Sequence, residues 1–226
     1  AASVDESKGV LVGVLTEIHP QSVSMVALDG YRLAVSTEKM NSGQENHFII
    51  SAKIINEISK IIAEDGDAEE VEIYLGKKKA TFRIDTTEIV LRLMEGEYIK
   101  YRDIMPTQST TDIVIGRAIL QESIERASLL AREGKNNLIK MTIKNNLLTI
   151  TSRSEEGNVK EEIIMEKEGE DLEIGFNSKF VIDVLKVIDD DEISMHFLTG
   201  TSPCMVKPVS GDAYEYLILP VRIPTM

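Results

Sequence analysis

Two stretches of this sequence resemble each other at an offset of 126 residues, and this repeat limits the possible folds more than any other feature. Each copy carries a helix-capping residue and two lysines: Ser51, Lys53 and Lys60 in the first copy, Asn177, Lys179 and Lys186 in the second. An acidic turn and a strand-like segment follow each copy. Solenoid repeats have periods of about 20 to 50 residues. The longer offset therefore predicts two tandem domains.

Apolar residues alternate with polar ones in much of the chain, which is typical of strands with one face in a core and one in water. The alternating segments are 71–75, 80–84, 89–93, 139–143 and 193–197. The connectors at Asp29-Gly30, 76–78 and Asn145-Asn146 are short and contain residues that tolerate positive φ. They predict antiparallel hairpins.

Three segments show helical spacing of apolar residues and predict helices over 51–63, 118–132 and 177–188, with Asn177 as an N-cap. Helices that alternate with antiparallel strands indicate an α+β fold. The polar segment 106–112 lacks periodicity and is the expected linker, so the domains are placed at residues 1–107 and 108–226. The second domain has a strand and a helix near its start that the first lacks. The chain is therefore expected to be a fragment.

The hydrophobic content and the single cysteine indicate the cellular compartment of the protein. Hydrophobic residues make up 42% of the chain, enough for well-formed cores. No apolar run approaches the roughly 20 residues of a membrane span, and Cys204 has no partner for a disulfide. We expect a soluble cytoplasmic protein that has no membrane partner.

The chemistry-bearing residues do not form an enzyme motif. His19, His47 and His196 are scattered, and no pair has metal-ligand spacing. The chain has no phosphate-binding glycine loop and no nucleophile elbow. We therefore expect no catalytic residues, no metal and no cofactor. A pocket that grouped His196 with carboxylates would favour an enzyme instead.

Two features indicate binding surfaces. Residues seven apart lie on one side of a helix, so each repeated lysine pair predicts a basic row, although an ordinary solvated helix face would look the same. At the C-terminus, Pro220 interrupts an apolar strand. Its last apolar residues then form either a tail that packs on its own domain or the wall of a groove for a partner peptide.

Four ordered motifs resemble the beta sliding clamp family of bacterial DNA polymerase III. They are Asp29-Gly30-Tyr31-Arg32-Leu33-Ala34, the segment from Glu97-Tyr98 to Met105-Pro106, Ile174-Gly175-Phe176-Asn177, and Leu217-Ile218-Leu219-Pro220-Val221-Arg222. The likeness extends from about residue 8 to residue 223. The resemblance implies two clamp domains, the first truncated at its N-terminus, from a non-catalytic, ring-forming homodimer with three domains per protomer.

The resemblance also implies partners: duplex DNA, the replicative polymerase, the clamp loader and other proteins that carry clamp-binding peptides. Helices would line the hole, which accounts for a net charge of −13 on a DNA-encircling protein, because acids would cover the outside. The family closes its ring by joining first domain to last. The fragment is therefore not expected to form a normal ring.

The site residues implied by the resemblance form three groups. A hydrophobic peptide pocket would be lined by Leu11, Leu28, Gly30, Tyr31, Arg32, Leu33, Ile99, Ile104, Asn177, Phe180, Leu217, Ile218, Leu219, Pro220, Val221 and Arg222. The DNA-facing cations would be Lys53, Lys60, Arg126, Lys179 and Lys186, and the ring interface would include Leu129 and Leu130. The alternative is a tandem-domain adaptor that binds proteins and never contacts DNA.

Overall fold

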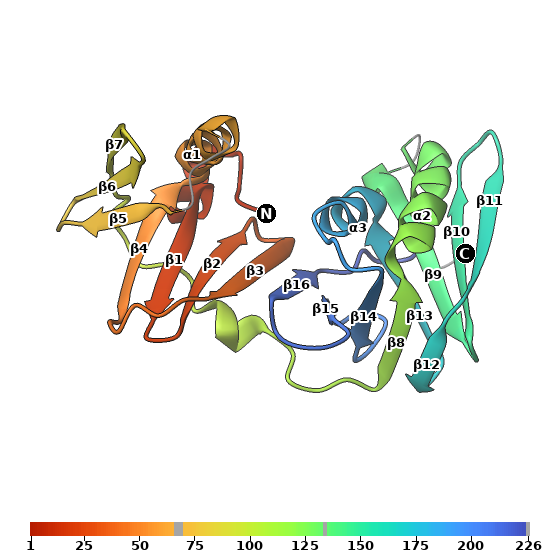
Figure 1. Cartoon of the computed structure of the whole chain (residues 1–226). Coiled ribbons are helices and arrows are strands. Elements are labelled where there is room, and N and C mark those ends of the chain that lie inside the picture. The colour runs from red at the N-terminus through yellow and green to blue at the C-terminus, as the bar shows by residue number, and fades with distance from the viewer. Residues whose placement is uncertain (66–69, 133–134, 225–226) are drawn as a thin grey trace. The chain divides into compact units, whose positions relative to one another are not determined.

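The computed structural model describes residues 1–65, 70–132 and 135–224, and the chain divides into two compact units (Figure 1). Unit 1 is Ala1–Lys100 and unit 2 is Tyr101–Met226. The domain boundary expected at 107/108 stays a prediction. However, the expected linker 106–112 is too long, because a strand begins at Thr111 and pairs with two others.

Unit 1 contains two antiparallel sheets and one helix. Its elements are η1 (Glu6–Val12), β1 (Gly13–His19), β2 (Ser22–Leu28), β3 (Arg32–Lys39), β4 (Asn46–Ser51), α1 (Ala52–Asp65), β5 (Glu72–Leu75), β6 (Lys79–Ile84) and β7 (Thr87–Arg92). The strand orders are β3-β2-β1-β4 and β5-β6-β7. The hairpins expected at Asp29-Gly30 and 76–78 are both present.

The core of unit 1 lies between α1 and its sheets. The predicted isoleucine stripe of α1 provides Ile58, which is buried, and Ile54, Ile55, Ile61 and Ile62 around it. This stripe packs against Phe48 and Ile50 of β4 and against apolar residues of β6 and β7. The helix begins at Ala52, because Ser51 still pairs with Gly13 as the last residue of β4.

The alternation over 71–75 was a poor guide to burial. We expected Val71, Ile73 and Leu75 on a core face, but Ile73 is 42% exposed and Val71 lies outside β5 and is exposed too. Strand β5 is at the edge of a three-stranded sheet, and only Leu75 packs against the core. The first acidic turn of the repeat extends into residues 66–69, outside the described residues.

Unit 2 is larger. Its elements are η2 (Tyr101–Ile104), β8 (Thr111–Gly116), α2 (Arg117–Ala131), η3 (Lys135–Asn137), β9 (Leu138–Lys144), β10 (Leu147–Arg153), β11 (Asn158–Ile164), β12 (Glu166–Gly169), β13 (Leu172–Asn177), α3 (Ser178–Leu185), β14 (Glu192–Phe197), β15 (Cys204–Pro208) and β16 (Tyr214–Ile218). The strand orders are β11-β10-β9-β13 and β12-β8-β14-β15-β16. The expected Asn145-Asn146 hairpin joins β9 to β10, with Asn145 at positive φ.

The helices of unit 2 pack against each other, and α2 covers β9, β10 and β11 (Figure 1). The helical spacing over 118–132 predicts an apolar stripe of Leu120, Ile124, Ala127 and Leu130. The first three are buried in α2, whereas Leu130 is only half-buried. The cap prediction for α3 is confirmed, because Asn177 Oδ1 accepts a hydrogen bond from the Lys179 N–H at 3.0 Å. Helix α3 ends at Leu185 rather than 188, with Lys186 as its C-cap, whose N–H donates to the Ile182 carbonyl.

The predicted repeat is confirmed in the order of the elements. The order β3-β2-β1-β4 in unit 1 corresponds to β11-β10-β9-β13 in unit 2, and β5-β6-β7 corresponds to β14-β15-β16. In both units a helix directly follows the last strand of the four-stranded sheet. Two tandem domains with helices on antiparallel sheets are therefore the fold of this chain, as the sequence predicted.

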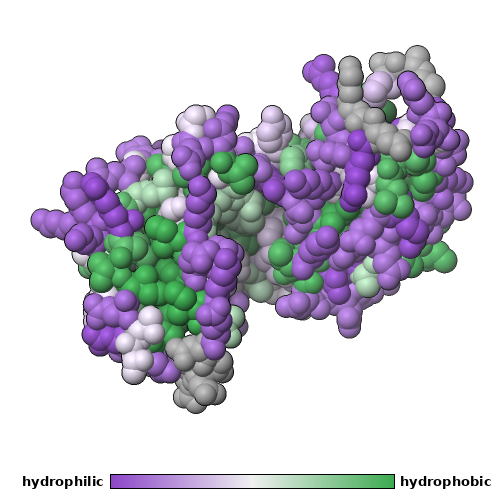
Figure 2. Space-filling view, turned by 90° about the horizontal axis from the view of Figure 1, so that it is seen from above, coloured by the Kyte–Doolittle hydropathy of each residue, from purple (hydrophilic) through white to green (hydrophobic). Residues whose placement is uncertain are grey.

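The two four-stranded sheets differ in what covers them. Thr16 of β1 pairs with Met25 of β2. The corresponding pair in unit 2 is Met141 of β9 with Ile150 of β10. Helix α2 covers that face in unit 2, where Ile150 is fully buried. The described part of unit 1 has no counterpart of α2, and Met25 is 40% exposed. Figure 2 shows more apolar surface gathered on unit 1 than on unit 2 on the face it presents.

We expect Thr16→Val to stabilise the chain by about 1 kcal/mol, because a buried hydroxyl without a hydrogen bond costs about 1–3 kcal/mol. Thr16 is 2% exposed, and within the described residues its Oγ1 has no hydrogen-bond partner. Valine keeps the shape of the side chain and removes the unsatisfied oxygen. Urea denaturation of the two proteins measures the change.

Thr111→Val is the matched control. Thr111 is equally buried, but its Oγ1 donates to the Glu170 carbonyl at 3.0 Å. The same substitution there loses a satisfied bond and should destabilise the chain by about 1 kcal/mol. The free energy of unfolding should therefore rise in Thr16→Val and fall in Thr111→Val. A fall in both variants would contradict the explanation given for Thr16.

Among the described residues, no α-helix combines the length and apolar character that crossing a membrane requires.

Candidate functional site

The turn between β2 and β3 is held in place by one carboxylate. Asp29 Oδ1 accepts hydrogen bonds from the N–H groups of Tyr31 (2.9 Å) and Arg32 (3.1 Å), and its Oδ2 accepts from Arg32 Nε at 3.0 Å. Gly30 has φ +95°, a conformation that an L-residue rarely adopts. The turn presents the Tyr31 ring to solvent, with 62% of the residue exposed. A rigid, exposed aromatic side chain is well suited to contact a partner.

The segment 97–106 is anchored by the half-buried Tyr98. The Tyr98 hydroxyl lies 3.3 Å from the Val26 carbonyl oxygen and 3.5 Å from that of Gly13, within hydrogen-bonding distance of both. Burial raises the pKa of Tyr98 to about 12, so the hydroxyl stays a donor at neutral pH. Ile99 and Ile104, on either side of the buried Tyr101, are exposed. The anchored segment thus holds two large apolar side chains at the surface.

The C-terminal segment leaves its sheet where Pro220 predicted a break. Strand β16 ends at Ile218, and Leu219, Pro220 and Val221 are half-buried outside it. The Val221 N–H donates to the Gly175 carbonyl of β13 at 2.8 Å, so the segment continues against unit 2. The tail therefore packs on its own domain, as one of the two interpretations of the sequence expected. Part of Leu219 stays accessible, and the groove for a partner peptide stays a prediction.

The residues expected in the peptide pocket differ in accessibility. Tyr31, Gly30, Ile99, Ile104 and Arg222 are exposed, and Leu11, Arg32, Asn177, Phe180, Leu219, Pro220 and Val221 are half-buried. Leu28, Leu33, Leu217 and Ile218 are buried and support the surface from beneath. Some of these residues belong to unit 1 and others to unit 2, and their convergence on one groove stays a prediction.

The cations expected to face DNA are exposed, and most are paired with acids. Lys53 lies 2.8 Å from Glu6, Lys60 2.7 Å from Glu57, and Lys186 3.8 Å from Glu125. Arg126 Nη2 lies 2.8 Å from Glu161 Oε2, and this hydrogen bond lowers the pKa of Glu161. Lys179 is exposed at the start of α3. Because exposed ion pairs contribute little to the free energy of folding, these cations can exchange partners.

Leu129 and Leu130, the residues expected at a ring interface, lie near the C-terminal end of α2. Leu129 is 63% exposed and Leu130 is half-buried. Strand β11 forms an edge of its sheet, and its last residue, Ile164, is also exposed. An exposed leucine near a free sheet edge is typical of a surface that another chain covers.

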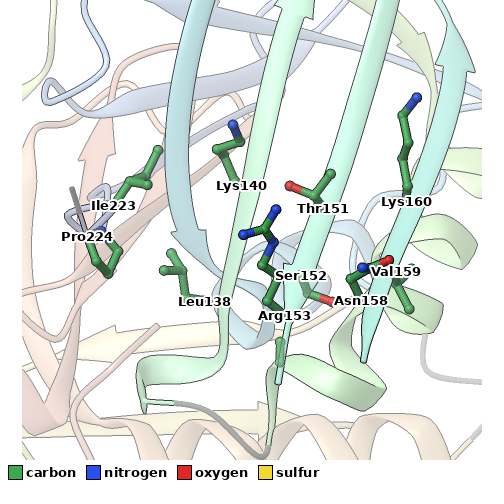
Figure 3. Close-up of a pocket in the computed structure, with 11 residues that line it drawn as sticks. Leu138, Lys140, Thr151, Ser152, Arg153, Asn158, Val159, Lys160, Ile223 and Pro224 are labelled. Carbon is green, nitrogen blue, oxygen red and sulfur yellow. The ribbon is translucent and has the colours of Figure 1, made fainter. Parts of the chain in front are cut away.

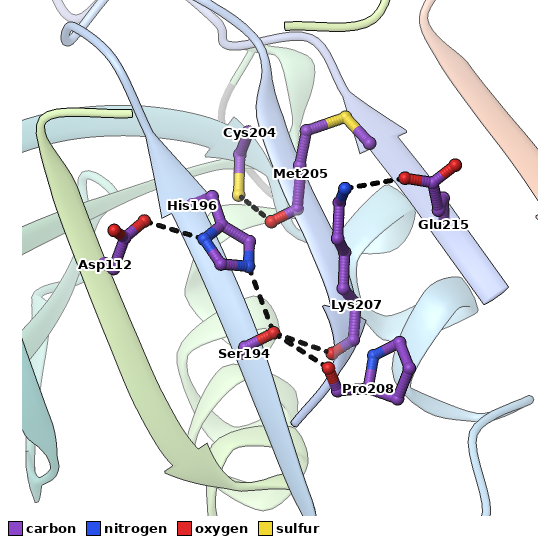
Figure 4. A network of polar contacts seen from close by, with 8 residues as sticks. All are labelled: Asp112, Ser194, His196, Cys204, Met205, Lys207, Pro208 and Glu215. Atoms are coloured by element: carbon purple, nitrogen blue, oxygen red, sulfur yellow. Dashed lines mark hydrogen bonds and ion pairs between the residues drawn. The ribbon is translucent and has the colours of Figure 1, made fainter. Parts of the chain in front are cut away.

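Sequence reasoning missed a polar row on the sheet of unit 2 (Figure 4). His196 Nδ1 lies 2.7 Å from Asp112 Oδ1, and His196 Nε2 lies 3.1 Å from Ser194 Oγ. The Ser194 hydroxyl donates to the carbonyl oxygens of Lys207 (3.1 Å) or Pro208 (3.2 Å). Asp112 and His196 are 84 residues apart and meet only because β8 pairs with β14.

This row resembles a Ser-His-Asp arrangement but does not position a nucleophile. The Ser194 proton points to backbone carbonyls, whereas a nucleophilic serine directs it to the histidine. Ser194 is also buried. Burial raises the pKa of the Cys204 thiol, which keeps that thiol unreactive. Although His196 does meet a carboxylate, this geometry does not favour an enzyme.

The chain matches family models over both units. The model for the central domain of the DNA polymerase III beta subunit matches residues 1–100, and the model for its C-terminal domain matches residues 102–222. A beta sliding clamp from Staphylococcus epidermidis is 37% identical over 225 residues, which cover 98% of this chain and 59% of that protein. One from Staphylococcus aureus is 35% identical with the same coverage. The chain thus spans about three fifths of the length of these curated relatives.

Solved structures give the same result. The DNA polymerase III beta subunit of Thermotoga maritima superposes with a TM-score of 0.93 at 34% identity, over 99% of this chain and 61% of that one. The sliding clamp of Bacillus subtilis gives 0.93 at 32% identity, over 99% and 60%. A Pseudomonas aeruginosa sliding clamp bound to griselimycin gives 0.92 at 27% identity, also over 99% and 60%. With both of its units matched in order, this chain belongs to the DNA polymerase III beta subunit family.

Proposed function

We propose that this chain forms the central and C-terminal domains of a bacterial DNA sliding clamp, a non-catalytic processivity factor of the replicative polymerase in the cytoplasm. The main support for this proposal is that both family models match in order and together span nearly the whole chain. The repeated helix-on-sheet units support the proposal, since each places lysines on or at the end of an exposed helix. The full-length protein would encircle duplex DNA as a homodimeric ring.

The peptide-docking part of this function rests on the surfaces around Tyr31, Ile99, Ile104 and Leu219. Each provides accessible apolar area next to a backbone held by hydrogen bonds or by a tertiary contact. The Pseudomonas aeruginosa clamp bound to griselimycin supports a ligand site on clamps of this fold. We infer that polymerase, clamp-loader and other clamp-binding peptides dock here by inserting one or two large apolar side chains. Burying each contributes about 1.5–3 kcal/mol, which makes micromolar affinity the natural scale.

Titrating a labelled Gln-Leu-x-Leu-Phe peptide against the 226-residue chain tests the docking function directly. Saturable binding is expected for wild-type protein. The absence of binding at millimolar peptide would overturn the docking function for this part of the clamp.

The adaptor that never contacts DNA remains the second candidate, favoured by the acidic partners of three helix lysines and a net charge of −13.

Replacing Lys53, Lys60, Lys179 and Lys186 with Glu in a full-length protomer discriminates between the clamp and the adaptor. We expect loading on DNA to fall at least about tenfold, because four cations that each contribute a few tenths of a kcal/mol are lost and the acids that replace them repel phosphate. Peptide affinity should not change. Unaltered loading would mean that these lysines form only a solvated face and would favour the adaptor.

The assembly of the chain follows from the proposed ring. Leu129 and Leu130 would meet the first domain of the other subunit, and that domain is not among these 226 residues. We therefore expect the chain to sediment as a monomer or a weak dimer. A tight two-fold ring in sedimentation would contradict this placement of the interface.

A further inference from the structure

The outer face of the four-stranded sheet in unit 2 carries a row of cations that the clamp function does not use. In the strand register Thr151 of β10 pairs with Lys140 of β9 on one side and with Lys160 of β11 on the other. Cross-strand partners point to the same face, with Cβ atoms about 4.5–5.5 Å apart. Arg153, two residues beyond Thr151, joins them on that face. A hydroxyl group thus lies in the middle of three cations.

These side chains line a cavity of about 570 Å³ (Figure 3). Its described lining consists of Ala131, Leu138, Lys140, Thr151, Ser152, Arg153, Asn158, Val159, Lys160, Ile223 and Pro224. None of these described residues is acidic, in a chain whose net charge is −13. Small-molecule sites have volumes of about 300–1,000 Å³. The cavity therefore has both the size and the charge for a small anionic ligand.

The two lysines can turn towards such a ligand at little cost. Lys140 lies 3.1 Å from Glu173, and Lys160 lies 2.6 Å from Glu162, but both carboxylates lie outside the described lining. Exposed ion pairs of this kind contribute at most about 1 kcal/mol. Glu173 also accepts a hydrogen bond from Thr142 Oγ1 at 3.0 Å, so it keeps a donor when Lys140 turns away.

The remaining wall of the cavity is apolar. Leu138, on the same face of β9 as Lys140, supplies this wall together with Ile223 and Pro224 of the C-terminal segment. A ligand that matches the cavity therefore combines a highly charged group with an apolar body. A carboxylate satisfies one cation, whereas a phosphate chain presents several negative oxygens, and the planar guanidinium of arginine binds phosphate through two hydrogen bonds.

We propose that this cavity binds a small organic phosphate of the nucleoside diphosphate class. One phosphoryl group accepts the Thr151 hydroxyl between Lys140 and Lys160, and the neighbouring phosphoryl group binds Arg153. Lysines on β9 and β11 are separated by two strand spacings, about 9–10 Å, which accommodates the first phosphoryl group between them. The organic part lies against Leu138 and Pro224. This site does not depend on the peptide-docking or DNA-binding functions.

Isothermal titration of ADP and of inorganic pyrophosphate into the 226-residue chain tests the proposal. We expect ADP to bind more tightly than pyrophosphate, because only ADP uses the apolar wall. Arg153→Gln and Lys160→Gln should each raise the Kd for ADP at least about tenfold, the change produced by losing about 1.4 kcal/mol of binding free energy. Lys160 is exposed on an edge strand, so its replacement leaves the fold intact and keeps the test valid if Arg153→Gln unfolds.

Lys78→Gln is the matched control, an exposed lysine of unit 1 that is paired with Glu95 at 2.8 Å. This control should leave the Kd for ADP unchanged within about twofold, a difference of about 0.4 kcal/mol. No ADP binding to the wild-type chain, or an equal loss in the control, would overturn the proposal. Displacement of ADP by a short DNA duplex would also overturn it, by assigning the cations to a nucleic-acid surface rather than to a small-molecule site.

Discussion

Replacing Leu219 with Asp is expected to lower the affinity of the chain for a Gln-Leu-x-Leu-Phe peptide at least about tenfold, or about 1.4 kcal/mol. Leu219 is half-buried just beyond β16, where the chain leaves the sheet. A carboxylate there would meet the peptide's Leu and Phe, and burying a charge without a partner is unfavourable. Fluorescence anisotropy of a labelled peptide, titrated with each protein, measures the change.

The substitution should leave both units folded, because Leu219 is not part of a buried core. Circular dichroism melting checks this. Leu129→Asp is the matched control, since Leu129 is an exposed leucine on α2 that is not expected to contact the peptide. It should bind the peptide like wild-type protein. Equal affinities for Leu219→Asp and wild-type protein would remove this surface as the docking site.

We expect Gly175→Ala to destabilise unit 2 by about 1–3 kcal/mol, because close-packed segments accommodate an added carbon poorly. A Cβ at Gly175 would lie 2.6 Å from the Val221 carbonyl oxygen, and a backbone atom cannot swing away as a flexible side chain can. The C-terminal segment would have to move off β13 and lose the bond from the Val221 N–H to the Gly175 carbonyl. Urea denaturation gives the free energy, and hydrogen exchange at Val221 reports the detachment.

Peptide affinity should fall in the same variant, because Leu219 and Val221 belong to the displaced segment. Gly116→Ala provides the comparison, since the nearest atom to a Cβ there is the movable Ile119 side chain at 3.2 Å. Gly116 is the N-cap of α2, and alanine at an N-cap costs about 1 kcal/mol or less relative to glycine. If hydrogen exchange at Val221 is as fast in Gly116→Ala as in Gly175→Ala, the steric explanation for Gly175 is wrong.

Features encoded by neighbouring residues could be predicted from the sequence. The period of two predicted five strands, β5, β6, β7, β9 and β14, and the short connectors predicted three hairpins. Helical spacing predicted the three α-helices of the described residues. Asn177 was identified as a cap because its side chain bonds to an N–H two residues away. The 126-residue repeat predicted tandem domains, which the matching strand orders confirm. In each case a pattern within one segment, or its recurrence along the chain, carried the information.

Partners that are distant in the chain were decided only by the tertiary structure. Ile73 follows the same alternation as Ile143, yet Ile73 is exposed on an edge strand while Ile143 is buried under a helix. His196 meets Asp112, and Lys140 and Lys160 flank Thr151, only because of the strand order and register that were adopted. Gly175 is needed because one carbonyl of a segment 46 residues later crosses it. Periodicity specifies which side chains share a face of a strand. Strand pairing and register specify what that face contacts, and both follow from the packing of the whole unit.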